Sequence, residues 1–86
     1  PKLIGITVLS SMVAVTHAIA KEVKNIVPTT KVMVGGVHAE LFPEAMLSNS
    51  SIDYVVRGDG EIPTYELLAE KPLKDIGGIS YRNEKN

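Results

Sequence analysis

Three short segments of the sequence place small and polar residues directly after an apolar run. They are residues 7–11, 35–40 and 57–61. If each apolar run is a strand of an open α/β sheet, these segments follow the carboxyl ends of strands, which is where such sheets bind ligands. We therefore expect any binding site of the chain to be built from these three segments.

The second segment begins with two consecutive glycines, Gly35 and Gly36. Because glycine has no Cβ, the backbone at such a pair can approach a ligand closely. The alternative is an ordinary turn between a strand and a loop, for which one glycine usually suffices. Both interpretations are open from the sequence.

The third segment, Arg57-Gly58-Asp59-Gly60-Glu61, precedes a predicted helix. Its carboxylates, Asp59 and Glu61, suit the positive end of a helix dipole, which would be a structural role. Alternatively, the segment forms a rim that contacts a polar group of a ligand. It is not a phosphate-binding P-loop, because the Gly-Lys-Ser/Thr ending is absent, and it does not follow the GxGxxG pattern.

His38 lies in the second segment, and together with Glu40, Asp59 and Glu61 it is a candidate for a metal-binding or catalytic role. The sequence contains no His-x-x-x-His or His-x-His pair, and a lone histidine in a loop is usually solvated or hydrogen-bonded. No Ser–His–Asp or paired-carboxylate spacing stands out, and neither Ser10 nor Ser11 lies in a Gly-x-Ser-x-Gly turn. We predict no catalytic residue and no metal site in this chain.

The composition limits the classes of function. The chain has 86 residues, 44% of them hydrophobic, a net charge of −1 and no cysteine. It is long enough for one small domain, and its neutral charge argues against nucleic acid or an anionic membrane as a partner. The lack of cysteine excludes disulfides, thiolate metal sites and iron–sulfur clusters ligated within the chain. No segment has the length of a membrane span or the pattern of a signal peptide, so we expect a cytoplasmic location.

The elements that must position the three segments alternate between strands and helices. Strands are predicted at residues 3–9, 31–34, 52–56 and 79–82, and helices at about residues 10–27, from near residue 43, and at about residues 62–70. This order, β-α-β-α-β-α-β, predicts an α/β fold with short connections and helical crossovers. We expect a Rossmann-like (flavodoxin-like) three-layer α/β/α arrangement around a parallel sheet.

The first predicted helix carries large apolar residues at spacings of three and four, which predicts a buried stripe. The stripe consists of Met12, Val15, Ile19, Val23 and Ile26. The opposite, solvent-facing side carries His17, Lys21 and Lys24. Ser10 or Ser11 is expected to cap the start of the helix, and Pro28 to end it.

Six segments occur together in a familiar order and spacing. They are Leu-Ile-Gly-Ile-Thr (3–7), Lys-x-x-x-Pro (24–28), Val-Met-Val-Gly-Gly-Val-His-Ala (32–39), Pro-Glu (43–44), Ile-Asp-Tyr-Val-Val-Arg-Gly-Asp-Gly-Glu (52–61) and Ile-Gly-Gly-Ile-Ser-Tyr-Arg (76–82). Over nearly its whole length the chain thus resembles the N-terminal cobalamin-binding domains of radical S-adenosylmethionine (radical SAM) proteins. The group named after the anaerobic magnesium-protoporphyrin IX monomethyl ester oxidative cyclase is similar in particular.

The resemblance implies a domain that binds cobalamin, with the nucleotide tail of the cofactor between the sheet and the helices. Thr7 and Leu9 stand where the wider fold has a Ser-x-Leu segment, which lines the tail cavity together with the Gly-Gly pair. Asp59 replaces a glutamate that is common at its position. The cofactor-binding residues implied in this way are Thr7, Leu9, Gly35, Gly36, His38, Arg57, Gly58, Asp59, Gly60 and Glu61.

Two family motifs have no counterpart in the sequence. These are the Asp-x-His-x-x-Gly segment, which supplies a ligand to cobalt, and the Cys-x-x-x-Cys-x-x-Cys motif of the radical SAM cluster. The resemblance implies that they lie in units before Pro1 and in a catalytic barrel after Asn86. Residues 1–86 would then be one partial domain, an accessory module that is not catalytic alone. S-adenosylmethionine and a 4Fe-4S cluster would belong to the parent protein, which would perform methyl transfer or an oxidative cyclisation or rearrangement.

A second function remains open. A domain of this fold that has lost its cofactor would serve as a docking or structural surface for the catalytic barrel. A receiver-like domain is set aside, because it needs an aspartate at the end of a strand and Asp53 stands at the start of one. Absent upstream strands would leave a sheet edge unpaired, and unpaired edges associate, so we expect the isolated chain to form a homo-oligomer.

Overall fold

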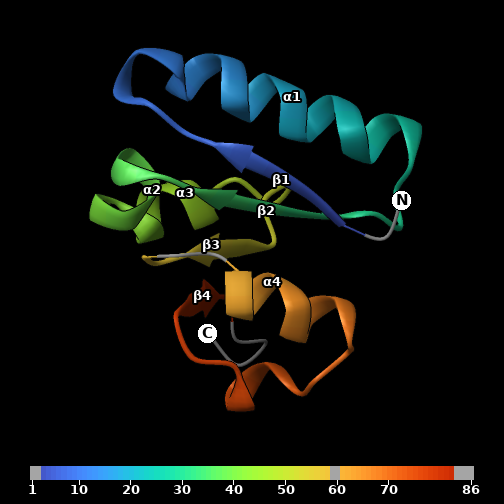
Figure 1. Cartoon of the computed structure of the whole chain (residues 1–86). Helices are drawn as coiled ribbons and strands as arrows, with labels where there is room; N and C mark the ends of the chain where they lie inside the picture. The colour runs from blue at the N-terminus through green and yellow to red at the C-terminus, as the bar shows by residue number, and fades with distance from the viewer. Residues whose placement is uncertain (1–2, 59–60, 83–86) are drawn as a thin grey trace.

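A four-stranded sheet forms the centre of the computed structural model, which describes residues 3–58 and 61–82 (Figure 1). The strands β1 (Leu3–Thr7), β2 (Lys31–Gly35), β3 (Tyr54–Val56) and β4 (Ile79–Tyr81) lie in that order across the sheet. The first three strands are parallel, with Thr7 opposite Gly35 and Val34 opposite Val55. Their carboxyl ends therefore lie at one edge of the sheet.

The last strand is antiparallel to β3, so the sheet is mixed and the all-parallel prediction is wrong at this strand. Its first residue, Ile79, pairs with Val56 at the carboxyl end of β3. Residues 69–78, including the short 3₁₀ turn η2 (Leu73–Asp75), lead back to this end after the helix that follows β3. Gly78, with φ 75°, then turns the chain, and its carbonyl accepts a hydrogen bond from the Arg57 amide at 2.7 Å. Because the chain returns to the carboxyl end of β3 before β4 begins, β4 runs antiparallel to β3.

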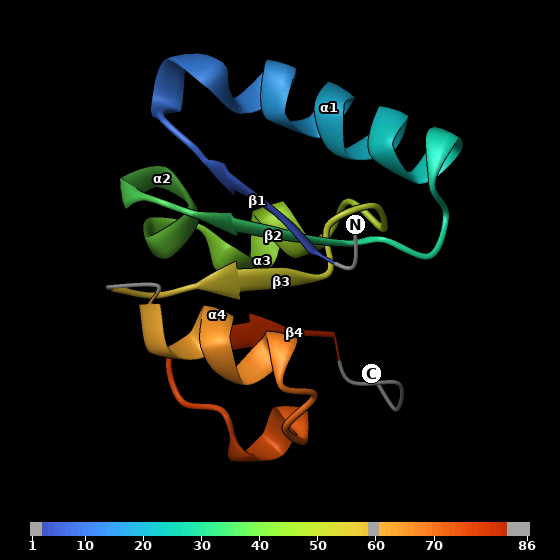
Figure 2. The ribbon, with the colours of Figure 1, turned by 45° about the vertical axis from the view of Figure 1, so that its right-hand side comes forward.

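Helices lie on both faces of the sheet, which confirms the predicted three-layer arrangement. They are α1 (Val13–Ile26), α2 (Val37–Leu41), α3 (Pro43–Leu47) and α4 (Glu61–Leu68), with a 3₁₀ turn η1 (Ser10–Met12) before α1. Side chains of α1, α2 and α3 form one apolar cluster with Val34 and Val55, whereas Leu67 of α4 packs on a second cluster that contains Val56. Since Val55 and Val56 are consecutive in β3, the two clusters lie on opposite faces. Figure 2 shows α3 behind the sheet and α4 in front of it.

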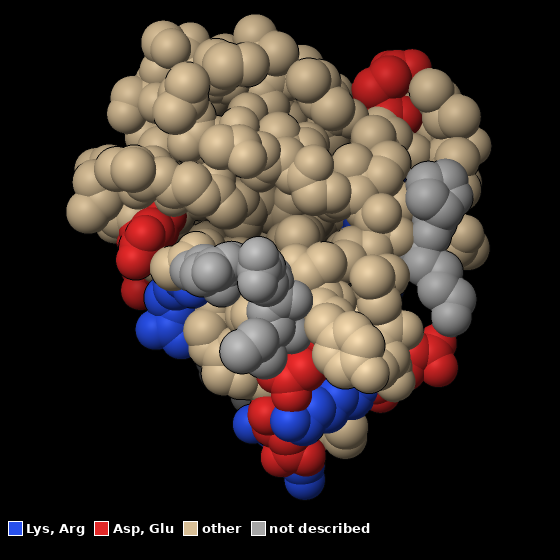
Figure 3. Space-filling model, viewed as in Figure 1, with Lys and Arg blue, Asp and Glu red and all other residues tan. Residues whose placement is uncertain are grey.

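The face that carries α4 is covered unevenly. The helix packs over β3 and β4, whereas Gly5 and Thr7 of β1 are exposed on this side. Figure 3, drawn from the same side as Figure 1, shows an almost entirely uncharged surface between α1 at the top and α4 below. Within residues 3–58 and 61–82, this part of the sheet carries no helix.

The orientation of α1 differs from the prediction. Thr16 and Ala20 are its buried residues, whereas Val15 is 51% and Ile19 is 42% exposed. Met12 and Ile26 are exposed as well, so Val23 is the one half-buried member of the predicted stripe. The helix turns small side chains toward the sheet, which lets the two elements approach closely.

Two polar contacts lie on the side of α1 that faces the rest of the fold. Asn49 Nδ2 donates to Nδ1 of His17 at 2.8 Å, and Lys24 Nζ lies 2.7 Å from Oδ2 of Asp53. The sequence analysis placed His17 and Lys24 on the solvent side, and this expectation is wrong. The side chain of Lys24 is only 21% exposed. The expected serine caps are also absent, because neither η1 nor α1 has a side-chain hydrogen bond at its first turn.

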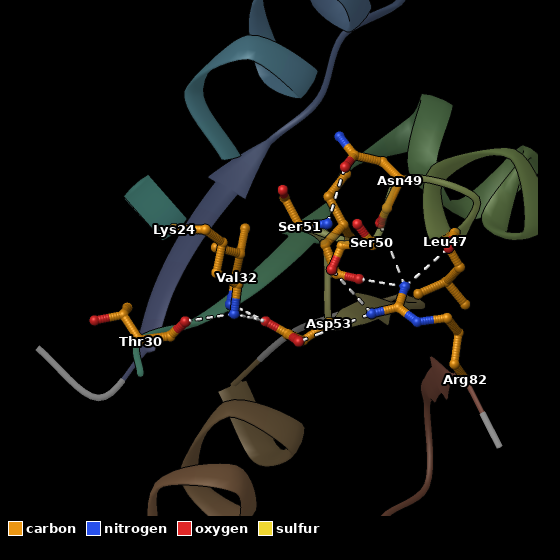
Figure 4. Close-up of polar contacts among 10 residues, drawn as sticks. Lys24, Thr30, Val32, Leu47, Asn49, Ser50, Ser51, Asp53 and Arg82 are labelled. Atoms are coloured by element: carbon orange, nitrogen blue, oxygen red, sulfur yellow. Dashed lines mark hydrogen bonds and ion pairs between the residues drawn. The ribbon is translucent and has the colours of Figure 1, made fainter. Parts of the chain in front are cut away.

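A polar cluster at the amino ends of the strands ties the layers together (Figure 4). Asp53 Oδ2 accepts hydrogen bonds from Lys24 Nζ and, at 2.8 Å, from the Val32 amide. Lys24 Nζ also donates to the Thr30 carbonyl at 2.6 Å. Arg82 donates to backbone carbonyls of the α3–β3 connection, and its Nη2 lies 3.9 Å from Oδ1 of Asp53. The cluster joins α1, β2, β3 and the end of β4 at the edge opposite the three candidate segments.

Candidate functional site

A hollow of about 280 Å³ lies at the carboxyl ends of β1, β2 and β3, on the sheet face that carries α4. We call it the site hollow. Its lining residues are all uncharged: Gly5, Ile6, Thr7, Met33, Gly35, Gly36, Val56 and Gly58. Residues from all three candidate segments therefore meet at one place, as the parallel strands predict. A hollow without charged side chains suits a neutral or aromatic group of a ligand.

The floor of the site hollow is largely backbone. Gly5 and Gly35 belong to adjacent strands, with Gly5 opposite Met33 and Thr7 opposite Gly35. A Cβ added at Gly35 would come no closer than 3.9 Å to Val56, the nearest side chain, so it would point into free space. Because Gly35 has no side chain, a flat group can lie directly against this part of the sheet, next to the Met33 side chain that lies over Gly5.

Gly36 has a different role from Gly35. Its φ is 94°, a conformation that side chains other than glycine rarely adopt. A Cβ at Gly36 would lie 3.0 Å from the Val8 carbonyl oxygen and 3.2 Å from Cγ2 of Thr7. Gly36 is thus required where the chain leaves β2 past the end of β1, while the Val8 amide donates to the Gly35 carbonyl at 2.8 Å. Of the two interpretations of the pair, the turn applies to Gly36. The close approach of a ligand to the backbone stays a prediction for Gly35.

Thr7 presents the only side-chain hydroxyl among the residues that line the site hollow. It is exposed at the end of β1, and its hydroxyl forms no hydrogen bond with any residue that the structure describes. This group is therefore available to donate to, or accept from, a ligand.

His38 and Leu9 flank the carboxyl edge but do not line the site hollow. His38 lies in the first turn of α2, whereas a loop was expected at this position. Its Nδ1 is 3.3 Å from Oγ of Ser10, and its ring packs on Phe42 with centroids 4.9 Å apart. Leu9, 52% exposed, precedes η1. The Ser10–His38 contact joins the first and second candidate segments above the edge of the sheet.

The third candidate segment contributes Gly58 to the site hollow, at φ 70°. Arg57 is exposed, and its Nη2 donates to the Ile79 carbonyl at 3.4 Å, on the side of β4. Asp59 and Gly60 lie outside the described residues. Glu61 is the first residue of α4, and its side chain also lies outside the description.

Four residues that line the site hollow were not predicted from the sequence: Gly5, Ile6, Met33 and Val56. A glycine inside an apolar strand often marks a close backbone approach, so Gly5 carried a usable signal. Met33 carried none, because a methionine in a strand is an ordinary core residue. Among the described residues, no three His, Asp or Glu side chains gather as metal ligands, and no helix there is long and apolar enough to cross a membrane.

Several known proteins are similar to this chain in sequence or in fold. The B12 binding domain family matches residues 1–68. The chain is 38% identical over 87 residues to an uncharacterised methyltransferase of Pyrococcus horikoshii, a match that covers 95% of this chain and 19% of that protein. It is 32% identical over 89 residues to cytidylyl-2-hydroxyethylphosphonate methyltransferase of Streptomyces wedmorensis, covering 96% of this chain and 16% of that protein. The chain thus spans less than a fifth of the length of these curated relatives.

A solved structure has the same architecture. The N-terminal domain of a hypothetical protein from Thermotoga maritima matches 81% of this chain and 56% of that chain, with a TM-score of 0.68 and 23% sequence identity. The likeness concerns the fold, and together with the family match it confirms the predicted flavodoxin-like α/β class.

Proposed function

Because the chain belongs to the B12-binding domain family, we propose that it binds cobalamin with the nucleotide tail of the cofactor in the site hollow. The observation that carries this proposal is the floor at Gly35, which no side chain covers closely, beside the available hydroxyl of Thr7. A planar, uncharged base fits against such a floor, and the Thr7 hydroxyl can hydrogen-bond a base nitrogen or a ribose oxygen. When bound, cobalamin supplies group-transfer or radical chemistry that no side chain of this chain provides.

The size of the site hollow supports binding of one part of the cofactor. At about 280 Å³ it lies just below the range for small-molecule sites, roughly 300–1,000 Å³. It therefore takes the tail, and the corrin ring would lie outside it at the carboxyl edge. Gly36 and the Ser10–His38 contact shape that edge.

For the parent protein we propose methyl transfer. Both curated relatives are named methyltransferases, and neither name mentions cyclisation, so they favour methyl transfer over the oxidative cyclisation suggested by the resemblance to the cyclase group. The radical SAM catalytic domain, with its S-adenosylmethionine and 4Fe-4S cluster, stays a prediction of that resemblance. In this proposal the chain is the cofactor-binding module and the catalytic residues lie elsewhere in the protein.

The test is titration of the folded full-length protein with hydroxocobalamin, followed by the change in visible absorption. Gly35→Val places a side chain in the site hollow, where only Val56 lies within 4 Å of the added Cβ. Gly77→Val is the matched control, because Gly77 has an ordinary φ, has no neighbour within 4 Å of an added Cβ and lies outside the hollow.

We expect the wild-type protein and Gly77→Val to bind alike, and Gly35→Val to bind about 5- to 150-fold more weakly, since filling a packed site costs about 1–3 kcal/mol. Circular dichroism establishes that each variant is folded. No binding by the folded wild-type protein would favour the cofactor-free docking module. Unchanged binding by Gly35→Val would show that the tail lies elsewhere.

A further inference from the structure

A second hollow, of about 470 Å³, lies near the amino ends of the strands. Leu3 and Lys31 line it from β1 and β2, Tyr54 from β3, and Leu67 and Leu68 from the end of α4. Its lining is mostly apolar, and nothing assigned so far to the chain uses it.

The two hollows lie on the same face of the sheet. Side chains of a strand alternate between faces, so Leu3, Gly5 and Thr7 share one face of β1. Leu3 lines the second hollow, while Gly5 and Thr7 line the site hollow. The register pairs Leu3 with Lys31 and Gly5 with Met33, which places the two hollows one after the other along β1 and β2.

The side chain of Met33 stands between them. It starts from β2, and its Sδ accepts a hydrogen bond from Oγ1 of Thr64, on α4, at 3.6 Å. In the other direction, its Cε lies 3.2 Å from the position that a Cβ of Gly5 would take. One thioether thus reaches from α4 to β1 and lines the site hollow on the side toward Leu3 and Lys31. The missing side chain at Gly5 is what makes room for it.

We propose that Met33 determines how deep a group can enter the site hollow, and so selects the size of the base at the end of the cofactor's tail. This inference rests on the proposed function of the site hollow. A methionine side chain is unbranched and adaptable, which suits a wall that must close against a flat ring. Shortening this side chain would lengthen the site hollow along the strands toward the second hollow and admit a longer base.

The experiment compares three corrinoids on the full-length protein by visible absorption titration. Cobalamin carries dimethylbenzimidazole, naphthimidazolyl cobamide carries a base with one further fused ring, and cobinamide has no base. The variants are Met33→Ala, which removes the wall, and Met33→Leu, which keeps nearly the same volume. Urea unfolding of both variants shows how much stability each retains.

In the wild-type protein we expect the larger base to bind at least about tenfold more weakly than cobalamin, the penalty of overpacking a closed site. Met33→Ala should reduce this difference to within about threefold, whereas Met33→Leu should keep most of it. Cobinamide should bind the wild-type protein and Met33→Ala equally, since it lacks the group that meets the wall.

The outcomes separate the two proposals. If the folded wild-type protein binds neither cobalamin nor cobinamide, the proposed function fails and this inference fails with it. If cobalamin binds and Met33→Ala discriminates between the two bases as the wild type does, the inference alone is overturned. Weaker cobinamide binding by Met33→Ala would overturn it as well, because Met33 would then support the whole site and not its depth.

Discussion

The two adjacent glycines at the end of β2 should respond very differently to the same small change. Gly35 and Gly36 are neighbours in the sequence and are both half-buried. At Gly35 an added Cβ would point into the site hollow, with Val56 the nearest side chain at 3.9 Å. At Gly36 it would meet backbone atoms of Val8 at 3.0 and 3.2 Å, at a φ of 94°. The pair Gly35→Ala and Gly36→Ala therefore separates the ligand-facing position from the position that the fold requires.

The magnitudes follow from these contacts. A positive φ costs an alanine about 1–2 kcal/mol, and a contact with backbone that cannot move adds about 1–3 kcal/mol. The lower entropy of the unfolded chain stabilises the alanine variant by about 0.4–1 kcal/mol. We expect Gly36→Ala to lower the free energy of unfolding by about 2–4 kcal/mol. For a chain of 86 residues, whose total stability is about 4–13 kcal/mol, that is a large loss. Gly35→Ala should cost less than about 0.5 kcal/mol.

Urea unfolding followed by far-ultraviolet circular dichroism measures both values on the same chain. Equal destabilisation by the two substitutions would contradict the assignment of different roles to the two glycines. So would a loss below about 1 kcal/mol at Gly36, because the contact with Val8 would then be one that the backbone relieves at little cost. Ligand titration of Gly35→Ala on the same material shows whether the remaining role of the pair is binding.

Two further predictions concern the amino ends of the strands. Asp53→Asn should lower the free energy of unfolding by about 1.5–3 kcal/mol, because it weakens charge-assisted hydrogen bonds to Lys24 and Val32 in a place where Lys24 and Asp53 are only 21% and 14% exposed. A double-mutant cycle with Lys24→Met measures the pair, and a coupling near zero would reduce it to an ordinary surface contact. Burial, and secondarily the charge of Asp53, raises the pKa of Tyr54 above 10.0. The unfolded chain then loses this proton first, so the stabilisation is full below pH 10 and is lost as the pH rises through the folded-state value. Tyr54→Phe should flatten the fall in unfolding free energy above pH 10.0, and an unchanged slope would assign the fall to other groups.

The fold class could be predicted because short apolar segments rich in Val and Ile alternate with segments of helical pattern that proline or glycine delimits. The direction of β4 was not predictable in the same way. It depends on residues 69–78, which form no regular helix or strand and return to the carboxyl end of β3 before β4 begins. Tertiary contacts such as the Arg57–Gly78 hydrogen bond decide that path. The local sequence pattern does not indicate such contacts.

The rotation of α1 shows a second limit of sequence patterns. Hydrophobic periodicity selects the largest apolar residues, and here it selected a stripe centred on Val15 and Ile19, both of which are exposed. The sheet packs on the smaller Thr16 and Ala20, while Lys24 anchors the end of the helix at Asp53. The partner of Lys24 is 29 residues away in the chain, so no window of the helix sequence contains it.

The site was predicted in its location and only partly in its composition. Parallel strands bring their carboxyl ends together whatever the side chains are, which is why Thr7, Gly35 and Gly58 meet as expected. The side chain of His38 depends instead on a short helix that the sequence did not reveal, and it contacts Ser10 and not the hollow. Met33 enters the site only because Gly5 leaves room on the neighbouring strand, a relation that needs the register of the sheet.

The uneven covering of the sheet connects stability with binding. In the part of the chain that the structure describes, α4 covers β3 and β4, whereas Gly5 and Thr7 on the same face remain open to solvent. A helix that packs on a sheet stabilises it by burying apolar surface, and a flat group held in the site hollow would bury the same surface of β1 and β2. Binding there acts on the folded chain alone, so a ligand at a hundred times its dissociation constant adds about 2.7 kcal/mol to the free energy of unfolding. The part of the sheet that α4 leaves uncovered is thus the proposed binding site, and a ligand there would bury surface that the described helices leave exposed.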